Sequence, residues 1–244
     1  MVSLICPSNN KEKFNNLKKS LESQTYADFE LICVDTEELK CNSAVEALNK
    51  GIELAKGDTY IFLHNDIEFQ NINDLEDIIN YIVKIRDFGI IGVAGAKFEN
   101  VTTIGNIYHG IPKRRISNEE IDKEVDVQTL DECLFVIKKA TLDKYPFDKN
   151  NKTWHLYAVD YSLYMNTIGK KVAVIPSKIY HVSPGSSINK EYYKELMKIC
   201  SKYKRMYKTI NTPMGFWSTN SIKLFLQIIK NKIKIFFLKQ RKEI

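Results

Sequence analysis

At 244 residues, the chain can form one large domain or a domain with an appendage, and a core of this size needs no disulfide staples. Its 44% of hydrophobic and 27% of charged residues are typical of an ordinary globular protein. Residues 221–244 hold seven basic residues and one acid, so this tail carries the whole formal net charge of +6 and the rest of the chain is balanced. The basic composition therefore does not indicate a nucleic-acid-binding protein.

The cysteines argue against a metal–thiolate site. They number five and include no C-x-x-C pair, and Cys6 and Cys33 lie inside apolar runs. Residues 2–6 enter directly into a strand-like run without the pattern of a secretory signal. We therefore expect reduced, buried thiols in a cytoplasmic protein.

Strands and helices alternate over the first 95 residues. Apolar runs predict strands at residues 2–6, 29–34, 60–63 and 89–94, and helical spacing predicts helices at 14–23, 42–57 and 75–83. Such alternation is typical of a parallel sheet built from βαβ units, and four strands fit a nucleotide-binding half. Neither a G-x-G-x-x-G after the first strand nor a P-loop motif is present, so neither a dinucleotide-binding fold nor a P-loop is supported.

The second half is less regular. Residues 96–128 are polar and contain Gly105, Gly110 and Pro112, which predicts a long loop region over a site. Apolar runs and helical spacing then predict the elements that follow. Strands are expected at 133–138, 171–175 and 178–181, helices at 157–168, 189–206 and from 221, a turn at 183–187 and a loop at 212–219.

A polar triplet, His64-Asn65-Asp66, follows the strand at 60–63. In an open α/β sheet, ligands bind beyond the carboxyl ends of the strands. An Asp at such a place can hold Mg²⁺ or Mn²⁺, and the cation can hold a phosphate. Spacing alone leaves a second interpretation equally open, namely an Asp that caps a turn or helix.

Several segments, in order, resemble the GT-A family-2 glycosyltransferases over about residues 2–187. In the first half these are Asp35 after the second strand, Asn49-Lys50-Gly51, Ala55-Lys56-Gly57-Asp58 and Phe62-Leu63-His64-Asn65-Asp66. In the second half they are Leu130-Asp131-Glu132, Tyr157 to Leu163, Gly169 to Val174 and Tyr180 to Ser186. His64 stands where the family's DxD motif has its first Asp, which is similar to the streptomycin-biosynthesis-type glycosyltransferase domain, where His-x-Asp is usual.

The resemblance implies an α/β GT-A fold, with a mostly parallel central sheet flanked by helices and a C-terminal helical extension. Residues 1–187 would form the catalytic domain, with a nucleotide-binding half at 1–95 and an acceptor half at 96–187. Residues 188–244 would form a basic, amphipathic extension.

The resemblance also implies roles for individual residues. Those expected to bind the nucleotide sugar are Pro7, Ser8, Asn9, Asp35, Asn49, His64 and Asn65. Asp66 and His181 would hold Mn²⁺ or Mg²⁺. Asp160 would be the general base, with Asp131 as second candidate, because Ala158-Val159 precede Asp160 and the family's usual carboxylate pair at this helix start is missing its first member. His155, beside Trp154, is interpreted as a packing or acceptor-site residue rather than a ligand.

The implied function is a metal-dependent glycosyltransferase. It would move a sugar from a nucleotide-sugar donor, expected to be a UDP-sugar, to a hydroxyl of a cell-surface glycan or lipid-linked acceptor by inverting single displacement. One alternative is a sugar-nucleotidyltransferase, but the Gly-rich, basic loop of that class is absent from residues 7–10. The other is a non-catalytic glycan-binding or scaffolding relative, which would be expected to lack Asp66, Asp160 or His181.

The tail has apolar residues at helical spacing with most lysines on the other side. These apolar residues are Ile222, Phe225, Leu226, Ile229, Ile233, Phe236 and Phe237. The segment is too interrupted by Lys to span a bilayer, which needs about 20 mostly apolar residues. It fits an interfacial helix on an anionic membrane, which would place the enzyme peripherally on the inner face. The alternative is a helix that packs on the catalytic domain or on a second subunit.

Overall fold

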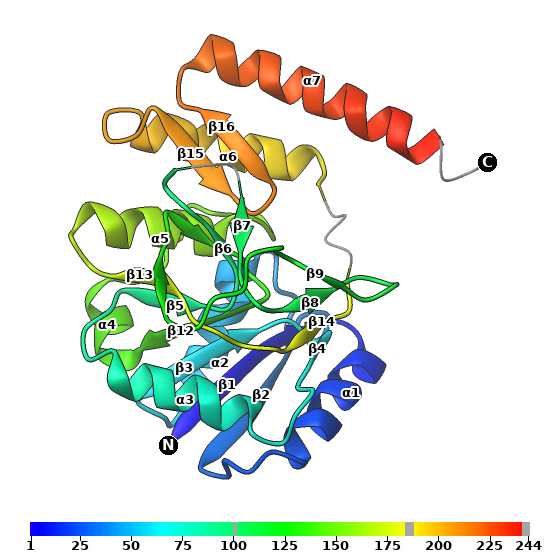
Figure 1. The fold of residues 1–244 in the computed structure, drawn as a ribbon, viewed down its shortest axis with the longest axis vertical. Helices are drawn as coiled ribbons and strands as arrows, with labels where there is room; N and C mark the ends of the chain where they lie inside the picture. Colours follow the sequence, from blue (N-terminus) through cyan, green and yellow to red (C-terminus); the bar gives the residue numbers. More distant parts are fainter. Residues whose placement is uncertain (100–101, 184–187, 241–244) are drawn as a thin grey trace.

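The computed structural model describes residues 1–99, 102–183 and 188–240 (Figure 1). Most of the turn predicted at 183–187 lies outside these residues, namely 184–187, and so does the end of the basic tail at 241–244. The helices are α1 (Lys11–Glu22), α2 (Ala44–Leu54), α3 (Asp74–Lys84), α4 (Lys139–Lys144), α5 (Tyr157–Thr167), α6 (Lys190–Tyr203) and α7 (Ser221–Gln240).

One large sheet forms the centre of the fold. In spatial order its strands are β10 (Val125–Asp126), β13 (Val172–Val174), β5 (Ile90–Gly92), β12 (Leu134–Lys138), β3 (Thr59–Leu63), β1 (Val2–Ser8) and β2 (Phe29–Asp35). The pairings give five of the seven strands one direction, with β10 and β12 opposed to them. The prediction of a mostly parallel central sheet flanked by helices is therefore confirmed.

The side chains of the central strands alternate between two buried faces of the sheet, because successive side chains of a strand point to opposite sides. Leu4 and Ile61 face a core with residues of α1 and α3, whereas Ile5 and Phe62 face a core with residues of α2 and α5. The helices thus cover both faces of the sheet, as Figure 1 shows. Burial on both faces explains why these strands read as continuous apolar runs.

The region after Gly95 is more structured than its sequence suggests. It contributes to two small sheets, one of β11 (Thr129–Leu130), β6 (Gly95–Ala96) and β7 (Thr103–Ile104). The other consists of β4 (Ile67–Glu68), β14 (Tyr180–His181), β8 (Tyr108–His109) and β9 (Arg114–Arg115). The expected long loop is thus folded into very short strands, too short for a run of alternating residues to reveal them.

The prediction of a loop at 212–219 is wrong. Residues there form a hairpin of β15 (Thr209–Thr212) and β16 (Gly215–Ser218), in which Thr212 pairs with Gly215. The turn between them is only two residues, Pro213 and Met214, and Trp217 of β16 is buried. The Pro fits here because Pro is compatible with a tight turn between strands.

The extension packs on the rest of the molecule. Leu156 and Val159, at the start of α5, belong to one buried cluster with residues of α6, the hairpin and α7, among them Leu196, Trp217 and Leu224. The tail helix therefore docks through one side on the body of the protein. Among the described helices, none has the length and apolar content to cross a membrane.

A candidate metal site beside a nucleotide-sized cleft

The polar triplet lies where the central sheet meets a small one. His64, Asn65 and Asp66 connect β3 to β4, and β4 pairs antiparallel with β14 so that Ile67 lies opposite His181. The backbone N–H of Val182 donates a hydrogen bond to the carbonyl of Asp66. This pairing brings His181 next to Asp66 although they are far apart in sequence.

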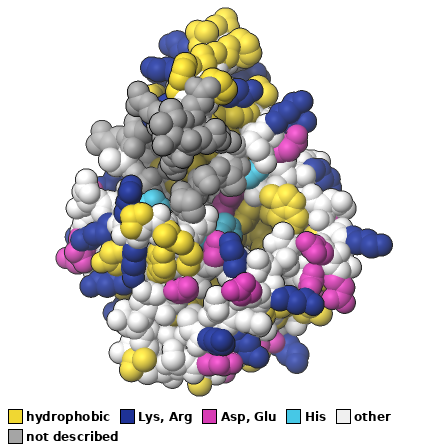
Figure 2. Space-filling view, turned by 90° about the vertical axis from the view of Figure 1, so that its right-hand side faces the viewer, with side chains coloured by type: hydrophobic (Ala, Val, Ile, Leu, Met, Phe, Trp, Pro, Cys, Tyr) yellow, Lys and Arg dark blue, Asp and Glu magenta, His cyan; other side chains and the backbone are white. Residues whose placement is uncertain are grey.

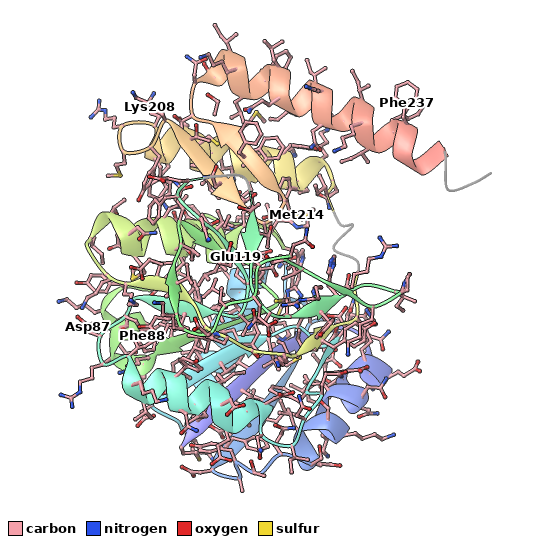
Figure 3. The ribbon with its side chains drawn as sticks, in the orientation of Figure 1. Asp87, Phe88, Glu119, Lys208, Met214 and Phe237 are labelled. Carbon is pink, nitrogen blue, oxygen red and sulfur yellow. The ribbon has the colours of Figure 1, made fainter. Side chains whose placement is uncertain are left out.

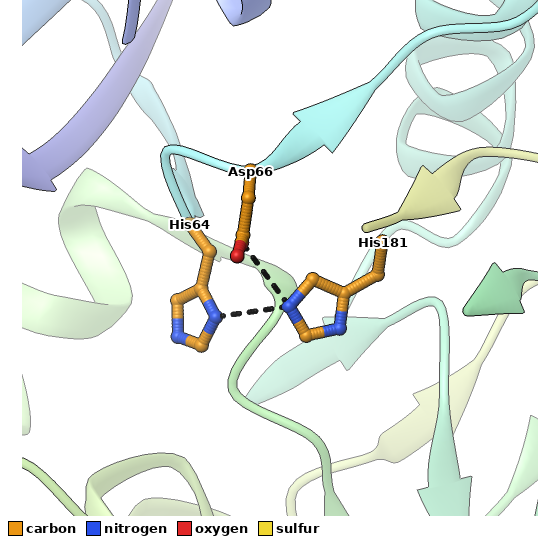
Figure 4. A group of neighbouring side chains, drawn as sticks. All are labelled: His64, Asp66 and His181. Atoms are coloured by element: carbon orange, nitrogen blue, oxygen red, sulfur yellow. Dashed lines mark hydrogen bonds and ion pairs between the residues drawn. The ribbon is translucent and has the colours of Figure 1, made fainter. Parts of the chain in front are cut away.

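Three side chains converge at this place (Figure 4). Nε2 of His181 lies 3.2 Å from Oδ1 of Asp66 and 3.5 Å from Nδ1 of His64. One ligand atom from each of the three residues lies within 4.8 Å of the others. The predicted metal ligands Asp66 and His181 are thus adjacent, and His64 joins them.

The site is electrostatically uneven. Burial, then the neighbouring His181, lowers the pKa of His64 to about 4, so this imidazole is neutral at pH 7. Burial opposes ionisation of Asp66, but His181, His64 and Lys13 together hold its pKa well below the usual range. Burial likewise opposes protonation of His181, yet Asp66 and Asp131 raise its pKa above the ordinary value.

These residues fit a divalent cation. Oδ1 of Asp66 is shut off from solvent and has no hydrogen-bond donor among the described residues, since His181 approaches it without hydrogen-bond alignment. A buried carboxylate oxygen in that state is unfavourable unless a cation or donor meets it. Two imidazole nitrogens and one carboxylate oxygen suit Mn²⁺ and leave room for phosphate oxygens.

A cleft of about 360 Å³ opens beside the three side chains. Its walls come from the end of β1, the start of α2, the end of β3 and the entry to α5. The predicted donor-binding residues that line it are Pro7, Ser8, Asn9, His64 and Asn65, together with Asp66. Nδ2 of Asn65 donates to Oγ of Ser8 at 2.8 Å, which ties the ends of β3 and β1 together.

Two predicted donor-binding residues lie elsewhere. Asp35 lines a smaller hollow of about 210 Å³ that shares Ser8 and Asn9 with the cleft. Its Oδ1 accepts the backbone N–H groups of Glu37 and Glu38 in a turn. Asn49 lies on α2, and among the described residues of that helix only Ala44 and Leu48 line the cleft; the structure does not bring Asn49 to the other site residues.

A second cavity, of about 240 Å³, also borders the three converging side chains. It shares His64, Asp66 and Glu132 with the cleft. The further residues that line it are Asp131, His155, His181, Ser183, Ile188, Tyr192 and Met214. Asp131 thus lies at the site, where its Oδ1 accepts the backbone N–H of Cys133 at 2.9 Å.

Asp160, the predicted general base, is engaged away from this site. Both of its carboxylate oxygens accept hydrogen bonds from Nζ of Lys202 on α6, at 2.9 and 2.8 Å. Lys202 also pairs with Asp148. Burial raises the pKa of Asp160, and Lys202 opposes that rise. This placement argues against a base role, because the carboxylate already has a cationic partner between two helices.

Three site residues were not singled out from the sequence. Glu132 lines both cavities; Tyr157 places its hydroxyl 3.4 Å from Nε2 of His64; and Lys13 places Nζ 3.2 Å from Oδ2 of Asp66. Burial, then the charge of Asp131, raises the pKa of Glu132 to about 8. The two acids before the strand at 133–138 were a visible signal for Glu132, whereas nothing in the pattern distinguishes Lys13 from the other lysines of α1.

A family model described as "Glycosyltransferase like family" matches residues 3–203 of the chain. No curated protein matches the chain at a significant level.

Solved structures with the same arrangement of elements include GalNAc-T7 with UDP, GalNAc and Mn²⁺, with a TM-score of 0.60 and 13% identity over 82% of this chain and 47% of that one. The mannosyltransferase PcManGT of Pyrobaculum calidifontis, in complex with GDP-Man and Mn²⁺, has a TM-score of 0.56 and 11% identity over 85% and 65% of the two chains. TarS 1–349 of S. aureus in complex with UDP-GlcNAc has a TM-score of 0.54 and 15% identity over 82% and 66%.

At these identities the likeness shows the fold alone, which is the α/β GT-A fold expected from the sequence. The chain spans about half of the length of GalNAc-T7 and about two thirds of the other two proteins.

Proposed function

This chain belongs to the glycosyltransferase-like family, and from that membership we propose that it moves a sugar from a nucleoside-diphosphate sugar to a hydroxyl group with the help of a divalent cation. The observation that carries this proposal is the convergence of His64, Asp66 and His181 at one wall of a cleft. The cleft lies at the carboxyl ends of β1 and β3, where open α/β sheets bind nucleotides.

The donor would lie in the cleft formed by the ends of β1 and β3. Pro7, Ser8 and Asn9 offer backbone and side-chain groups to the nucleotide, and Asp35 lies in the adjoining hollow, where a carboxylate can accept two ribose hydroxyls. We propose a UDP-sugar, because UDP or UDP-GlcNAc is bound in several similar structures, although one holds GDP-Man. Asn49 near the diphosphate remains a prediction of the resemblance.

His64, Asp66 and His181 would hold Mn²⁺ or Mg²⁺ next to the diphosphate. When bound, the cation acts as a Lewis acid that offsets the negative charge developing on the leaving diphosphate. Asn65 orients the triplet through its bond to Ser8, and Lys13 adds a positive charge beside Asp66. The half-buried imidazole of His64 is neutral, which is the form that can ligate.

We propose a single displacement that inverts the anomeric centre. The second cavity meets the donor cleft at His64, Asp66 and Glu132, so an acceptor hydroxyl placed there can approach the sugar from the side opposite to the nucleotide-binding end of the cleft. The His64-x-Asp66 pattern further supports a place in the streptomycin-biosynthesis-type branch.

The acceptor is proposed to be a lipid-linked or cell-surface glycan. Seven apolar side chains of α7 are 40–73% exposed, and basic side chains lie among them. Figure 2 shows hydrophobic and basic side chains together at the end of the molecule that α7 forms. This surface fits a peripheral position on an anionic, inner membrane face, where such acceptors lie.

A hydrolysis screen over UDP- and GDP-sugars, with and without Mn²⁺, tests the proposal. We expect metal-dependent donor binding and slow release of the nucleoside diphosphate. Asp66→Ala should lower Mn²⁺ affinity at least about tenfold, because it removes the single carboxylate of the group. Asp122→Asn, at an exposed acid that lines neither cavity, is the matched control. Metal-independent binding, or Asp66→Ala with unchanged Mn²⁺ affinity, would refute the metal assignment.

A further inference from the structure

Glu132 has a position that the proposed function leaves without a role. It precedes β12, which pairs antiparallel with β3 so that Leu134 lies opposite Leu63. The backbone N–H of His64 donates to the carbonyl of Cys133 at 2.9 Å, which fixes the two segments side by side. Of the described residues, three line both the cleft and the second cavity, namely His64, Asp66 and Glu132. The first two belong to the metal-binding group, so Glu132 is the remaining acid on the shared wall.

The first turn of α5 holds the carboxylate of Glu132. The backbone N–H groups of Leu156, Tyr157 and Ala158 lie near it and oppose the rise of its pKa, because they favour its charged form. These are donors that a helix start leaves free, and the positive end of the helix dipole favours a carboxylate there. Ala158 carries only a methyl group, so α5 supplies the donors at this place while the strand supplies the acid.

One oxygen of Glu132 is without a partner in the described part of the chain. Oε1 is shut off from solvent and meets no hydrogen-bond donor among the residues that the structure describes. Buried polar atoms in native proteins nearly always have a partner, and an unsatisfied one costs free energy. The missing partner is therefore expected to be a donor that arrives with a ligand, such as a hydroxyl group.

The other two acids near the site are already engaged. Oδ1 of Asp131 accepts the backbone N–H of Cys133. Asp131 lines the second cavity, but it is not among the described residues that line the cleft. Asp160 forms its ion pair with Lys202 between α5 and α6. Among the described acids outside the metal-binding group, Glu132 is the one that combines an unpartnered oxygen with a position on both cavities.

We propose that Glu132 is the general base of the sugar transfer, and that the second cavity receives the acceptor; this rests on the proposed function. The acceptor oxygen forms a bond to the anomeric carbon as the bond from that carbon to the diphosphate oxygen breaks, with its electron pair leaving on the diphosphate. The hydroxyl proton passes to the carboxylate of Glu132. His155 and Tyr192, whose rings pack at 5.7 Å between centroids, and Met214 form the apolar wall on which a sugar ring of the acceptor can lie.

The test compares Glu132→Gln with Asp131→Asn in the full chain. The probe is Mn²⁺-dependent hydrolysis of the UDP- or GDP-sugar that the wild type turns over, with water in the place of the acceptor. Gln keeps the shape and can still accept the N–H groups of α5. We therefore expect Glu132→Gln to bind the donor within about twofold of the wild type but to turn it over about 10²–10⁴ times more slowly, the usual contribution of a positioned base. Asp131→Asn should lose much less.

Glu132→Ala with added formate provides the second measurement. A small carboxylate that enters the vacated space should restore part of the turnover, which a merely structural role would not allow. Glu132→Gln with full turnover, or a loss of donor affinity as large as the loss of turnover, would overturn the base role and leave the proposed function standing. A wild type that neither binds nor hydrolyses any donor would overturn both.

Discussion

At the scale of single residues, the site contains two carboxylates with opposite proton affinities. Asp66 lies among His181, His64 and Lys13, which keep it ionised, whereas Glu132 lies beside Asp131 in a buried place that favours the neutral acid. A pair of acids whose surroundings drive their pKa values apart is a common mark of acid–base assignments in enzymes. Asp66 is suited to hold a cation, and Glu132 to accept a proton once substrates and metal alter its surroundings.

The raised pKa of Glu132 predicts a specific pH dependence of stability. Its pKa of about 8 in the folded chain exceeds the ordinary 4.5, so folding favours the protonated form. This contribution is complete below about pH 4.5 and is lost as the pH rises through about 8. The free energy of unfolding of the wild type should therefore fall relative to that of Glu132→Gln between pH 5 and pH 8.

The difference should reach a few kcal/mol, since one pKa unit corresponds to about 1.4 kcal/mol. Urea unfolding with a chelator present, at several pH values, measures it. Subtracting the free energy of unfolding of Glu132→Gln from that of the wild type removes the pH dependence of the groups that the two proteins share. A difference that stays constant across this range would show that Glu132 titrates normally in the folded chain.

Some of these site residues could be predicted from the sequence, and others could not. Asp66 followed a recognisable strand, and His181 came from the order of motifs in the family resemblance. Glu132 could not be separated from Asp131, because adjacent residues in a turn before a strand point in different directions that only the register with β3 decides. The base role predicted for Asp160 did not take Lys202 into account, since that partner comes from a helix in the extension.

At the scale of elements, α5 connects the site with the extension. Its first turn lies beside Glu132, and its residues Val159 and Leu163 pack in one buried cluster with α6, the hairpin and α7. The ion pair between Asp160 and Lys202 joins α5 to α6. We interpret this pair as a support for the helix that positions Glu132.

Lys202→Met should therefore destabilise the chain without weakening donor binding directly. The side chain of Asp160 is only 10% exposed, so loss of its cation leaves a largely buried carboxylate unpaired. Because the side chain of Lys202 is itself 40% exposed, we expect a loss of about 2 kcal/mol rather than the larger cost of a fully buried pair. Denaturant unfolding measures the loss.

Asp160→Asn and the double variant complete the cycle. The double variant should be less destabilised than the sum of the two single ones, because it contains no unpaired charge. If Asp160→Asn instead abolished turnover while the stability and donor affinity of the chain were preserved, Asp160 would be the base, as the sequence first suggested.

Prediction of helices and strands from the sequence succeeded where an apolar pattern extended over many residues. Apart from β10, which lies in the expected loop region, the central strands and α1, α2, α3, α5, α6 and α7 follow clear apolar patterns, and α7 was found from its spacing alone. The two-residue strands after Gly95 carry too few residues to show alternation, and the two strands of the hairpin at 209–218 are also short. Those elements are set by contacts with distant segments, such as the pairing of Tyr180 with Tyr108.

At the scale of the whole molecule, α7 has two different sides. Leu224 and Ile228 are buried against the hairpin and α6, while Phe225 and Phe236 are each more than half exposed. Figure 3 shows Phe237 pointing away from the body of the protein. One side of the helix therefore packs on the protein, as the alternative interpretation of the tail expected, and the other side is exposed, as the proposed membrane contact requires.

Phe225→Ser combined with Phe236→Ser should weaken binding to vesicles that contain anionic lipid by at least about tenfold. Burying a Phe side chain contributes about 1.5–3 kcal/mol, and two are removed while the packed side of the helix is kept. Vesicle co-sedimentation measures the affinity. Vesicles of neutral lipid alone are the control and should bind the wild type weakly. Equal binding of the variant and the wild type would exclude this side of α7 as the membrane contact.

The hairpin between β15 and β16 has a consequence for how an acceptor is supplied. Met214, at its turn, lines the second cavity and also the groove between the hairpin and α7, which contains Phe216, Lys230 and Ile233 (Figure 3). A lipid-linked substrate held in that groove would present its sugar to the cavity from a fixed tether. The rate of sugar transfer would then follow the number of acceptors per unit of membrane area rather than their concentration in the surrounding solution.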